Sequence, residues 1–200
     1  MNYKSDMLRI KRYSHSLRIV MNVFYWAAII VAIGSLITAL VITFMSDSHF
    51  VLNDEKIGNI GFTVDGLIEY NLKDASLMGL SLKNVYTSIA IMAAVISFLT
   101  IPALKQLVLI LKSVEENKPF AKENSKRISI IGVVFIFGSF IIPAAEFFVA
   151  RTIVDTLKIQ NVSVNYTGNF ILVFAGILMI ILSGIFKYGS YLQHEYDETV

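Results

Sequence analysis

The residue best placed for chemistry in this 200-residue chain is Glu146, near the end of an apolar stretch over residues 128–149. An ionisable residue in such a stretch is a candidate functional group, because a charge is costly to place in hydrocarbon. Arg151 follows five positions later and would neutralise Glu146 if a helix ended near Val149. Two interpretations remain open: a proton- or cation-responsive site, or a structural ion pair near the lipid headgroups, which we favour.

Patterns that carry catalysis are otherwise missing from the sequence. It contains no Cys, so it offers neither a thiolate ligand nor a Cys nucleophile. His15, His49 and His194 lie in different segments, and there is no His-Glu-x-x-His pair. A Gly-rich phosphate loop and a Gly-x-Ser-x-Gly elbow are absent as well. We therefore expect a protein that is not an enzyme and that needs no metal and no cofactor.

Long apolar stretches must position the few charged groups. Of all residues 56% are hydrophobic and only 16% are charged, against about 25% charged in a typical soluble protein. A helix needs ~20 apolar residues to cross the hydrocarbon core. The sequence thus predicts an all-α polytopic membrane protein, a single domain (residues 1–200) of four transmembrane helices. The predicted spans are residues 22–45, 85–111, 128–149 and 169–186.

Each predicted span also carries small residues seven positions apart. Such residues let helix backbones approach closely. The pattern favours a packed bundle over a pore. The pairs are Ala28 and Ser35, Ala90 and Ser97, Gly132 and Ser139, and Gly176 and Ser183.

The distribution of Lys and Arg predicts the orientation of the chain. Twelve of the seventeen lie in the N-terminal arm, around the connection at residues 112–127, or just after the last span. The other five lie in the two remaining connections, residues 46–84 and 150–168. Cytoplasmic loops are enriched in Lys and Arg, so we expect both termini inside a bacterial inner membrane. The first span is too long for a cleaved signal core and is expected to remain as an anchor.

The two outer connections have the alternating pattern of β-strands. Phe62–Tyr70 places β-favouring residues around an Asp-Gly pair, which is typical of a hairpin. Leu157–Tyr166 alternates apolar and polar residues. Because an isolated hairpin is only marginally stable, we expect both segments to pair into one small extracytoplasmic β cap.

The third helix is expected to begin before its membrane span. Asn117 can cap a helix whose first turn contains Pro119, and the second helix is expected to continue to Glu116. The resulting cytoplasmic hairpin would carry a collar of cations. Two interpretations are open: the collar anchors the protein on anionic lipid, or it is a docking surface for another protein.

Two cytoplasmic stretches carry a resemblance to a known family. One is a Pro-Phe pair at Pro119 and Phe120, followed by Asn124, a Lys-Arg pair and Gly132 at the start of the third span. The other is the chain end, where the last span runs into Gly189-Ser-Tyr-Leu192, then acidic residues, then Thr-Val. Together they resemble a bacterial four-span membrane family, domain of unknown function 2975. Glu198 departs from its pattern, which has an apolar residue there.

The resemblance implies a partner. Members of that family are often encoded beside a small helix-turn-helix regulator, which implies a membrane protein that holds or inactivates this regulator in response to an envelope signal. The alternatives are a transporter or channel component that uses Glu146, an immunity or envelope-protection protein, and an acidic tail that merely folds against the collar. Expected partners are the bilayer, the regulator and, as an open alternative, further copies of the chain, with no direct contact to nucleic acid. The candidate docking residues are Pro119, Phe120, Lys122, Asn124, Lys126 and Arg127 in the connection, and Gly189, Leu192, Glu195 and Asp197 in the tail.

Overall fold

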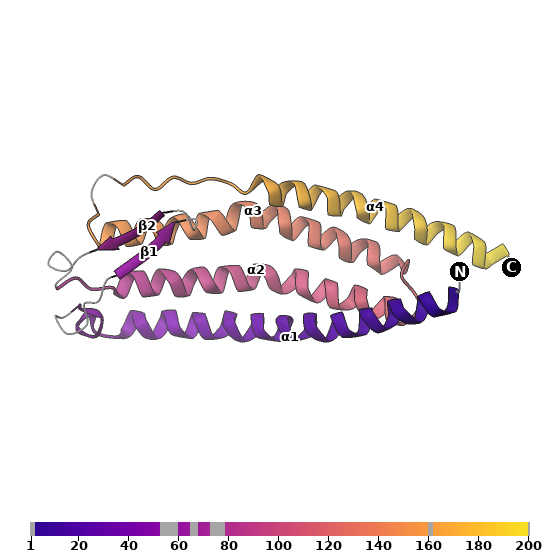
Figure 1. Ribbon diagram of the computed structural model, residues 1–200, viewed down its shortest axis with the longest axis horizontal. Coiled ribbons are helices and arrows are strands. Elements are labelled where there is room, and N and C mark those ends of the chain that lie inside the picture. The colour runs from indigo at the N-terminus through magenta and orange to yellow at the C-terminus, as the bar shows by residue number, and fades with distance from the viewer. Residues whose placement is uncertain (1–2, 53–59, 65–67, 73–78, 160–161, 200) are drawn as a thin grey trace. The chain divides into compact units, whose positions relative to one another are not determined.

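Four long helices make up most of the chain (Figure 1). The computed structural model describes residues 3–52, 60–64, 68–72, 79–159 and 162–199. The elements are α1 (Tyr3–Phe44), a short 3-10 helix η1 (Asp47–Phe50), β1 (Ile60–Val64), β2 (Ile68–Leu72), α2 (Lys83–Glu115), α3 (Lys122–Thr156) and α4 (Phe170–Thr199).

The chain divides into two compact units. Unit 1 comprises residues 1–33, 93–144 and 166–200, and unit 2 comprises residues 34–92 and 145–165. Each is described by itself. The division matches the charge distribution, because all twelve Lys and Arg of the predicted cytoplasmic segments fall in unit 1 and the other five fall in unit 2.

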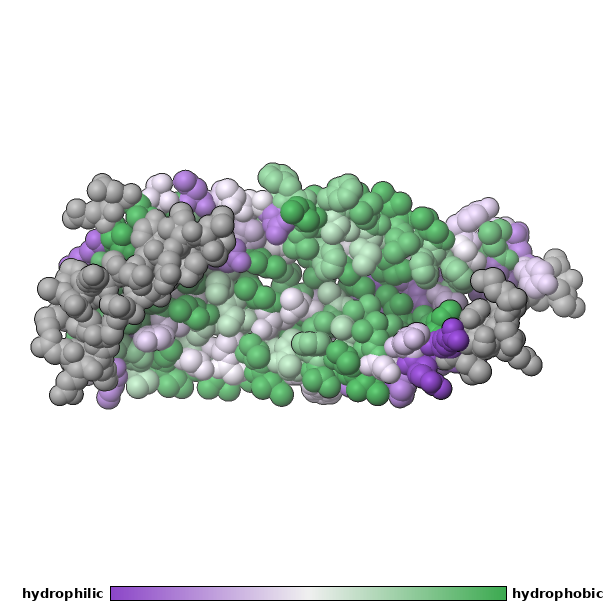
Figure 2. All heavy atoms as spheres, in the orientation of Figure 1, coloured by the Kyte–Doolittle hydropathy of each residue, from purple (hydrophilic) through white to green (hydrophobic). Residues whose placement is uncertain are grey.

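All four helices are long and apolar enough to cross a membrane, and they run 27 to 36 residues over the parts searched. Each covers one of the predicted spans to within one residue, so the prediction of a four-helix membrane protein is confirmed. The helices extend beyond the predicted spans into polar residues, among them Lys, Arg, Glu and Gln, which are good helix formers. Figure 2 shows hydrophobic side chains covering much of the visible helix surface. Isoleucine, leucine and phenylalanine remain exposed along α1 and α4, as expected where lipid is the solvent.

Within unit 1, α3 and α4 cross at two glycines. A Cβ added to Gly132 would lie 2.7 Å from the carbonyl oxygen of Gly176, and a Cβ added to Gly176 would lie 2.7 Å from that of Gly132. No side chain fits at that distance, so the two backbones touch only because both residues are Gly. This is the close approach that small residues permit in membrane helices.

Polar residues pair one heptad to either side of this crossing. Ser125 and Ser183 each donate a hydroxyl hydrogen bond of 2.8 Å to the other's carbonyl oxygen. The backbone N–H of Asn169, just before α4, donates to the carbonyl oxygen of Ser139 at 2.9 Å. Each step of seven residues along α3 is therefore matched by a step of seven in the opposite direction along α4. We call these six residues the α3–α4 seam: Ser125, Gly132, Ser139, Asn169, Gly176 and Ser183.

Pro143 explains why the chain before α4 lies on α3. A proline inside a helix has no N–H, so it leaves the carbonyl four residues earlier without its helical partner. That carbonyl belongs to Ser139, and it accepts a hydrogen bond from the backbone N–H of Asn169. The hydroxyl of Tyr166 donates to the neighbouring carbonyl of Phe140 at 3.2 Å. The segment that leads into α4 is thus held by two carbonyls of α3, one of which Pro143 leaves without its helical partner.

The predicted β cap from both outer connections is not supported. β1 and β2 pair antiparallel, with Phe62 opposite Tyr70; the Asp-Gly turn between them lies outside the described residues. The sheet has only these two strands, and residues 157–159 and 162–169 of the second connection form no strand. The reason is local: α3 runs on to Thr156, and the rest of the connection leads to the carbonyls at Pro143.

The predicted start of α3 is also wrong. Asn117 has a left-handed φ of 60° and ends α2 instead of capping α3. The N–H of Lys118 bonds to the carbonyl of Ser113 and that of Asn117 to Val114, which is the Schellman arrangement at a helix C-terminus. Asn tolerates the left-handed region better than most residues. α3 therefore begins at Lys122, and Pro119 lies in the turn between the helices.

Candidate functional site at the α2–α3 connection and the end of α4

The α2–α3 connection of unit 1 is fixed by one buried side chain, Asn124. It lies in the first turn of α3 with none of its surface exposed. Its Nδ2 donates to the hydroxyl oxygen of Ser113 and, at 2.9 Å, to the carbonyl of Pro119. Its Oδ1 accepts a 2.8 Å bond from Arg127. One amide therefore joins the end of α2, the turn and the first turns of α3.

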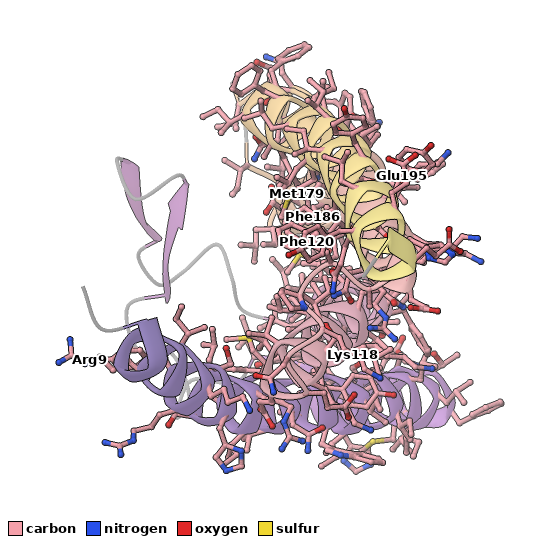
Figure 3. All side chains as sticks on the ribbon, turned by 90° about the vertical axis from the view of Figure 1, so that its right-hand side faces the viewer. Arg9, Lys118, Phe120, Met179, Phe186 and Glu195 are labelled. Carbon is pink, nitrogen blue, oxygen red and sulfur yellow. The ribbon has the colours of Figure 1, made fainter. Side chains whose placement is uncertain are left out.

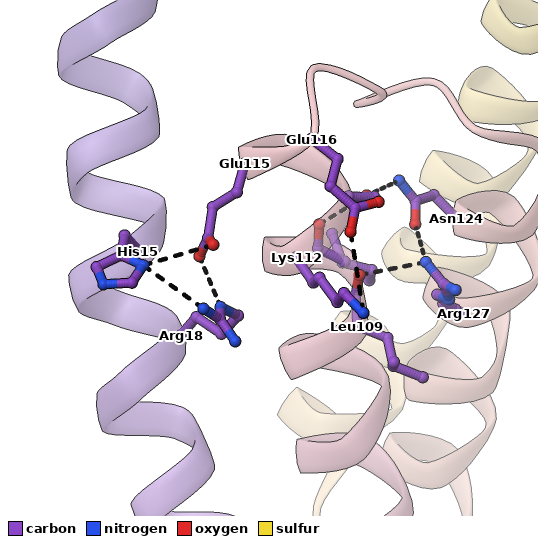
Figure 4. A network of polar contacts seen from close by, with 10 residues as sticks. His15, Arg18, Leu109, Lys112, Glu115, Glu116, Asn124 and Arg127 are labelled. Carbon is purple, nitrogen blue, oxygen red and sulfur yellow. Dashed lines mark hydrogen bonds and ion pairs between the residues drawn. The ribbon is translucent and has the colours of Figure 1, made fainter.

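Arg127 completes this arrangement, which we call the Asn124–Arg127 clamp (Figure 4). The same Nη1 that bonds to Asn124 also donates to the carbonyl of Leu109 in α2, at 3.2 Å. A cation near the carbonyl end of a helix is electrostatically favourable. Asn124 and Arg127 were predicted as docking residues, but the structure directs both inward, where they hold the connection in shape.

Phe120 ties the connection to α4. Its ring centroid lies 5.4 Å from that of Phe186, and Figure 3 labels the two residues next to each other on the same side of α4. A Cβ added to Gly189 would come within 3.0 Å of the Phe120 ring, so the absence of a side chain there lets the ring lie against the helix. Phe120 and Gly189, both predicted site residues, are thereby brought together.

An ion pair attaches α1 to the end of α2 in the same unit. Arg18 Nε donates to Glu115 at 2.7 Å, and His15 lies 3.5 Å from the same carboxylate. Glu115 follows the predicted span by four residues, and the hydrogen bond from Arg18 lowers the pKa of its carboxyl below the ordinary value. The carboxylate is therefore ionised at neutral pH. The sequence did not predict this pair, since nothing local signals a contact between residues nearly a hundred positions apart.

Cations surround the connection on its exposed side. Lys118, Lys122 and Lys126 are all exposed, and Pro119 is half-buried. These three lysines form the part of the predicted collar that can meet another molecule, because Arg127 is committed to the clamp.

The end of α4 presents an aromatic surface. Tyr188, Tyr191 and Tyr196 are 65%, 58% and 70% exposed, and Leu192 is 46% exposed. We call these four residues the α4 aromatic tail. Glu195 accepts a hydrogen bond from the Tyr191 hydroxyl, and Glu198 lies 3.5 Å from His194. These carboxylates thus have partners one turn away in α4, which argues against the alternative of a tail folded onto the collar; Asp197 lies in α4, and its side chain is outside the described part.

The other predicted site, in unit 2, differs from its prediction. α3 does not end near Val149, so Arg151 stays on the helix and pairs with Asp155 at 3.7 Å. No ion pair joins Arg151 to Glu146 among the described residues, and the Glu146 side chain is exposed. The predicted Glu146–Arg151 pair is therefore wrong. Within the same described residues, no group of three or more His, Asp or Glu side chains is arranged to hold a metal ion.

Comparison with known proteins gives one match. The family model described as protein of unknown function (DUF2975) matches residues 71–200. This range takes in α2, α3, α4, the clamp and the aromatic tail. No curated protein and no solved structure matches the chain.

Proposed function

Because the chain belongs to the DUF2975 family, whose function is unknown, we propose its function from its own residues. It is a non-enzymatic protein of the bacterial inner membrane with both termini in the cytoplasm. It holds a small cytoplasmic helix-turn-helix regulator at the membrane and so keeps it from its DNA. The observation that carries the proposal is a rigid connection with exposed cations beside an exposed aromatic helix end.

Charge supports the orientation. Unit 1 holds twelve of the seventeen Lys and Arg, and the positive-inside rule assigns the richer side to the cytoplasm. Most of the described cations of unit 1 lie beyond the ends of the apolar spans, where they can meet anionic lipid or an acidic protein surface.

The surface itself has the composition of a binding site. Tyr is enriched among the residues that dominate interface energies, and such residues act as anchors when they enter pockets of a partner. The α4 aromatic tail offers three exposed tyrosines of this kind, with Leu192 beside them. The lysines at 118, 122 and 126 would steer an acidic face of the regulator toward it. The clamp and the Phe120 contact hold this surface in one shape, which lowers the entropic cost of binding.

The test is co-purification of the tagged full chain in mild detergent, compared with a form that lacks Tyr191–Val200. This deletion removes most of the aromatic tail but leaves the Phe120 contacts at Phe186 and Gly189. Tyr13→Ser, at a tyrosine that is 72% exposed on α1, is the matched control. A helix-turn-helix protein recovered with the full chain and with Tyr13→Ser, but lost on deletion, supports the proposal.

Two results count against it. Recovery of the same regulator with the deleted form would move the binding surface away from α4. Failure to recover any helix-turn-helix protein with the full chain would favour the lipid interpretation, in which the tyrosines lie at the headgroups and the lysines bind anionic lipid. Binding to vesicles of anionic lipid, lost on deletion of the tail, would then confirm that alternative.

The remaining alternatives make different predictions. A transporter component that relies on Glu146 would lose its activity in Glu146→Gln and keep it after deletion of the tail. An envelope-protection protein would depend on unit 2, whose hairpin is the natural place to receive an envelope signal. The regulator proposal expects the reverse pattern, with Glu146→Gln silent and the deletion decisive.

A further inference from the structure

Unit 2 contains a cavity that neither the sequence analysis nor the proposed function uses. It lies between the first turns of α2 and the last turns of α3 and has a volume of about 560 Å³. Small-molecule sites are typically ~300–1,000 Å³, so the cavity can hold a ligand. It is independent of the surface proposed to bind the regulator, because that surface lies in unit 1.

The polar wall of the cavity presents hydrogen-bond acceptors. Thr87, Ser88 and Thr152 line it. Their hydroxyl protons are donated to carbonyls of their own helices, those of Lys83, Val85 and Phe148, at 2.8 to 2.9 Å. A hydroxyl that has donated its proton can still accept through its lone pairs. A ligand in this cavity therefore meets three hydroxyl oxygens that can accept hydrogen bonds, besides the amide of Asn84, which can donate and accept.

The charge in the cavity is negative. Asp155 is the ionisable side chain among the described residues that line it. Its ion pair with Arg151 is exposed and 3.7 Å long, and such a surface pair is weak. Lys83, the nearest cation in sequence on the α2 side, is directed elsewhere: its Nζ bonds to the carbonyl of Met45 and pairs with Asp47. The C-terminal end of α3 adds partial negative charge.

The other wall is apolar and accessible from outside. Ile91 and Phe148 line it and are 41% and 53% exposed. An apolar chain can thus lie along these side chains while a polar head occupies the cavity. The first turn of α2 presents the partial positive charge of a helix N-terminus to the polar headgroup of such a ligand. This charge suits a headgroup that carries an anionic group next to its cationic group.

We propose that the cavity between α2 and α3 binds the primary ammonium group of an amphiphile, with the ammonium at Asp155 and the hydroxyl oxygens and the apolar chain along Ile91 and Phe148. An ammonium has three N–H donors for an acceptor-lined site. The ligand can come from the bilayer, as the headgroup of phosphatidylethanolamine, or from solution, as an alkylamine.

Native mass spectrometry of the detergent-solubilised full chain measures the binding directly. The two probes are dioleoyl phosphatidylethanolamine and dioleoyl phosphatidylcholine, which have the same chains and a positive nitrogen, but only the former has N–H donors. We expect the ethanolamine lipid to bind at least about tenfold tighter than the choline lipid, because this ratio corresponds to the free energy of one charge-assisted hydrogen bond. Asp155→Asn should abolish this preference. Glu146→Gln should keep it, because that carboxylate lies on the same helix but does not line the cavity.

A second variant and a soluble probe complete the test. The double variant Thr87→Val with Thr152→Val serves as a second test in case Asp155→Asn does not fold. It removes two hydroxyl acceptors with little change in side-chain size and should weaken the preference for the ethanolamine lipid severalfold. Octylamine should compete with the ethanolamine lipid for the cavity. If octylamine binds and the lipid does not, the ligand is a soluble amine, and the proposal that the cavity binds an ammonium group still holds. Equal binding of the two lipids without octylamine binding, or an unchanged preference in a folded Asp155→Asn, would overturn the proposal.

Discussion

Replacement of Asn124 by Ala tests whether the clamp holds unit 1 together. The change removes the donors to Ser113 and Pro119 and the acceptor for Arg127. A neutral hydrogen bond contributes about 1 kcal/mol and one to a charged group about 1.5–3 kcal/mol. Pro119 and Arg127 are both half-buried, so water recovers part of the loss at these two bonds, whereas the Ser113 bond is lost from a buried position. We expect a destabilisation of about 2–4 kcal/mol.

The assay is reversible unfolding by SDS in mixed micelles, followed by helix content. Lys122→Ala, at an exposed neighbour, is the control and should change stability by less than about 0.5 kcal/mol. A double-mutant cycle with Arg127→Ala should show a coupling of about 1–3 kcal/mol, as for residues in one network. If Asn124→Ala costs less than about 1 kcal/mol, or the coupling is near zero, the clamp does not stabilise the connection and the reasoning fails.

Three further predictions concern the packing of unit 1. Gly176→Val places a side chain against the facing backbone carbonyl and should lower the free energy of unfolding by about 1–3 kcal/mol or more in the same SDS assay. Gly184→Ala is the control and should be tolerated, because nothing lies within 4 Å of the new Cβ. Equal effects of the two variants would show that α3 and α4 do not touch at Gly176. Asn117→Gly relieves a left-handed φ and should be neutral or stabilising by up to about 1 kcal/mol; a clear loss would contradict the Schellman ending of α2. The Glu115 ion pair contributes stability above the ordinary carboxyl pKa of 4.5, because its folded pKa is lowered, and this contribution is lost as the pH falls from there through the folded pKa. The free energy of unfolding of the wild type should therefore exceed that of Glu115→Gln at pH 7, and this difference should shrink as the pH falls below 4.5. A difference that does not change with pH would exclude the Arg18 pair as its source.

The sequence was sufficient for the membrane architecture. Apolar length alone predicts the four helices, since a segment of ~20 apolar residues has one stable form in lipid. The spacing of small residues also anticipated a packed bundle, and Gly132 and Gly176 do meet. The hairpin around Phe62 and Tyr70 followed from strand-favouring residues near a turn. These features are properties of short stretches of chain.

Tertiary contacts decided what the individual site residues do. Asn124 and Arg127 were predicted as docking residues because the family resemblance includes both and the predicted collar includes Arg127. They are turned inward because α2 ends in a Schellman motif that brings Ser113 and Leu109 within reach. That ending depends on Asn117, whose sequence context equally suits the start of the next helix.

The second outer connection shows the same limit. Its alternating residues predict a strand, but alternation says only that a segment can be extended, not which backbone groups it meets. Those groups are the carbonyl of Ser139, which Pro143 leaves without its helical N–H partner, and the neighbouring carbonyl of Phe140. Polarity, length and charge are readable residue by residue, so the sequence by itself determined the helices and the segregation of cations. The identity of a hydrogen-bond partner far along the chain exists only once the helices are in register, so the clamp, the seam and the cavity between α2 and α3 belong to the tertiary structure.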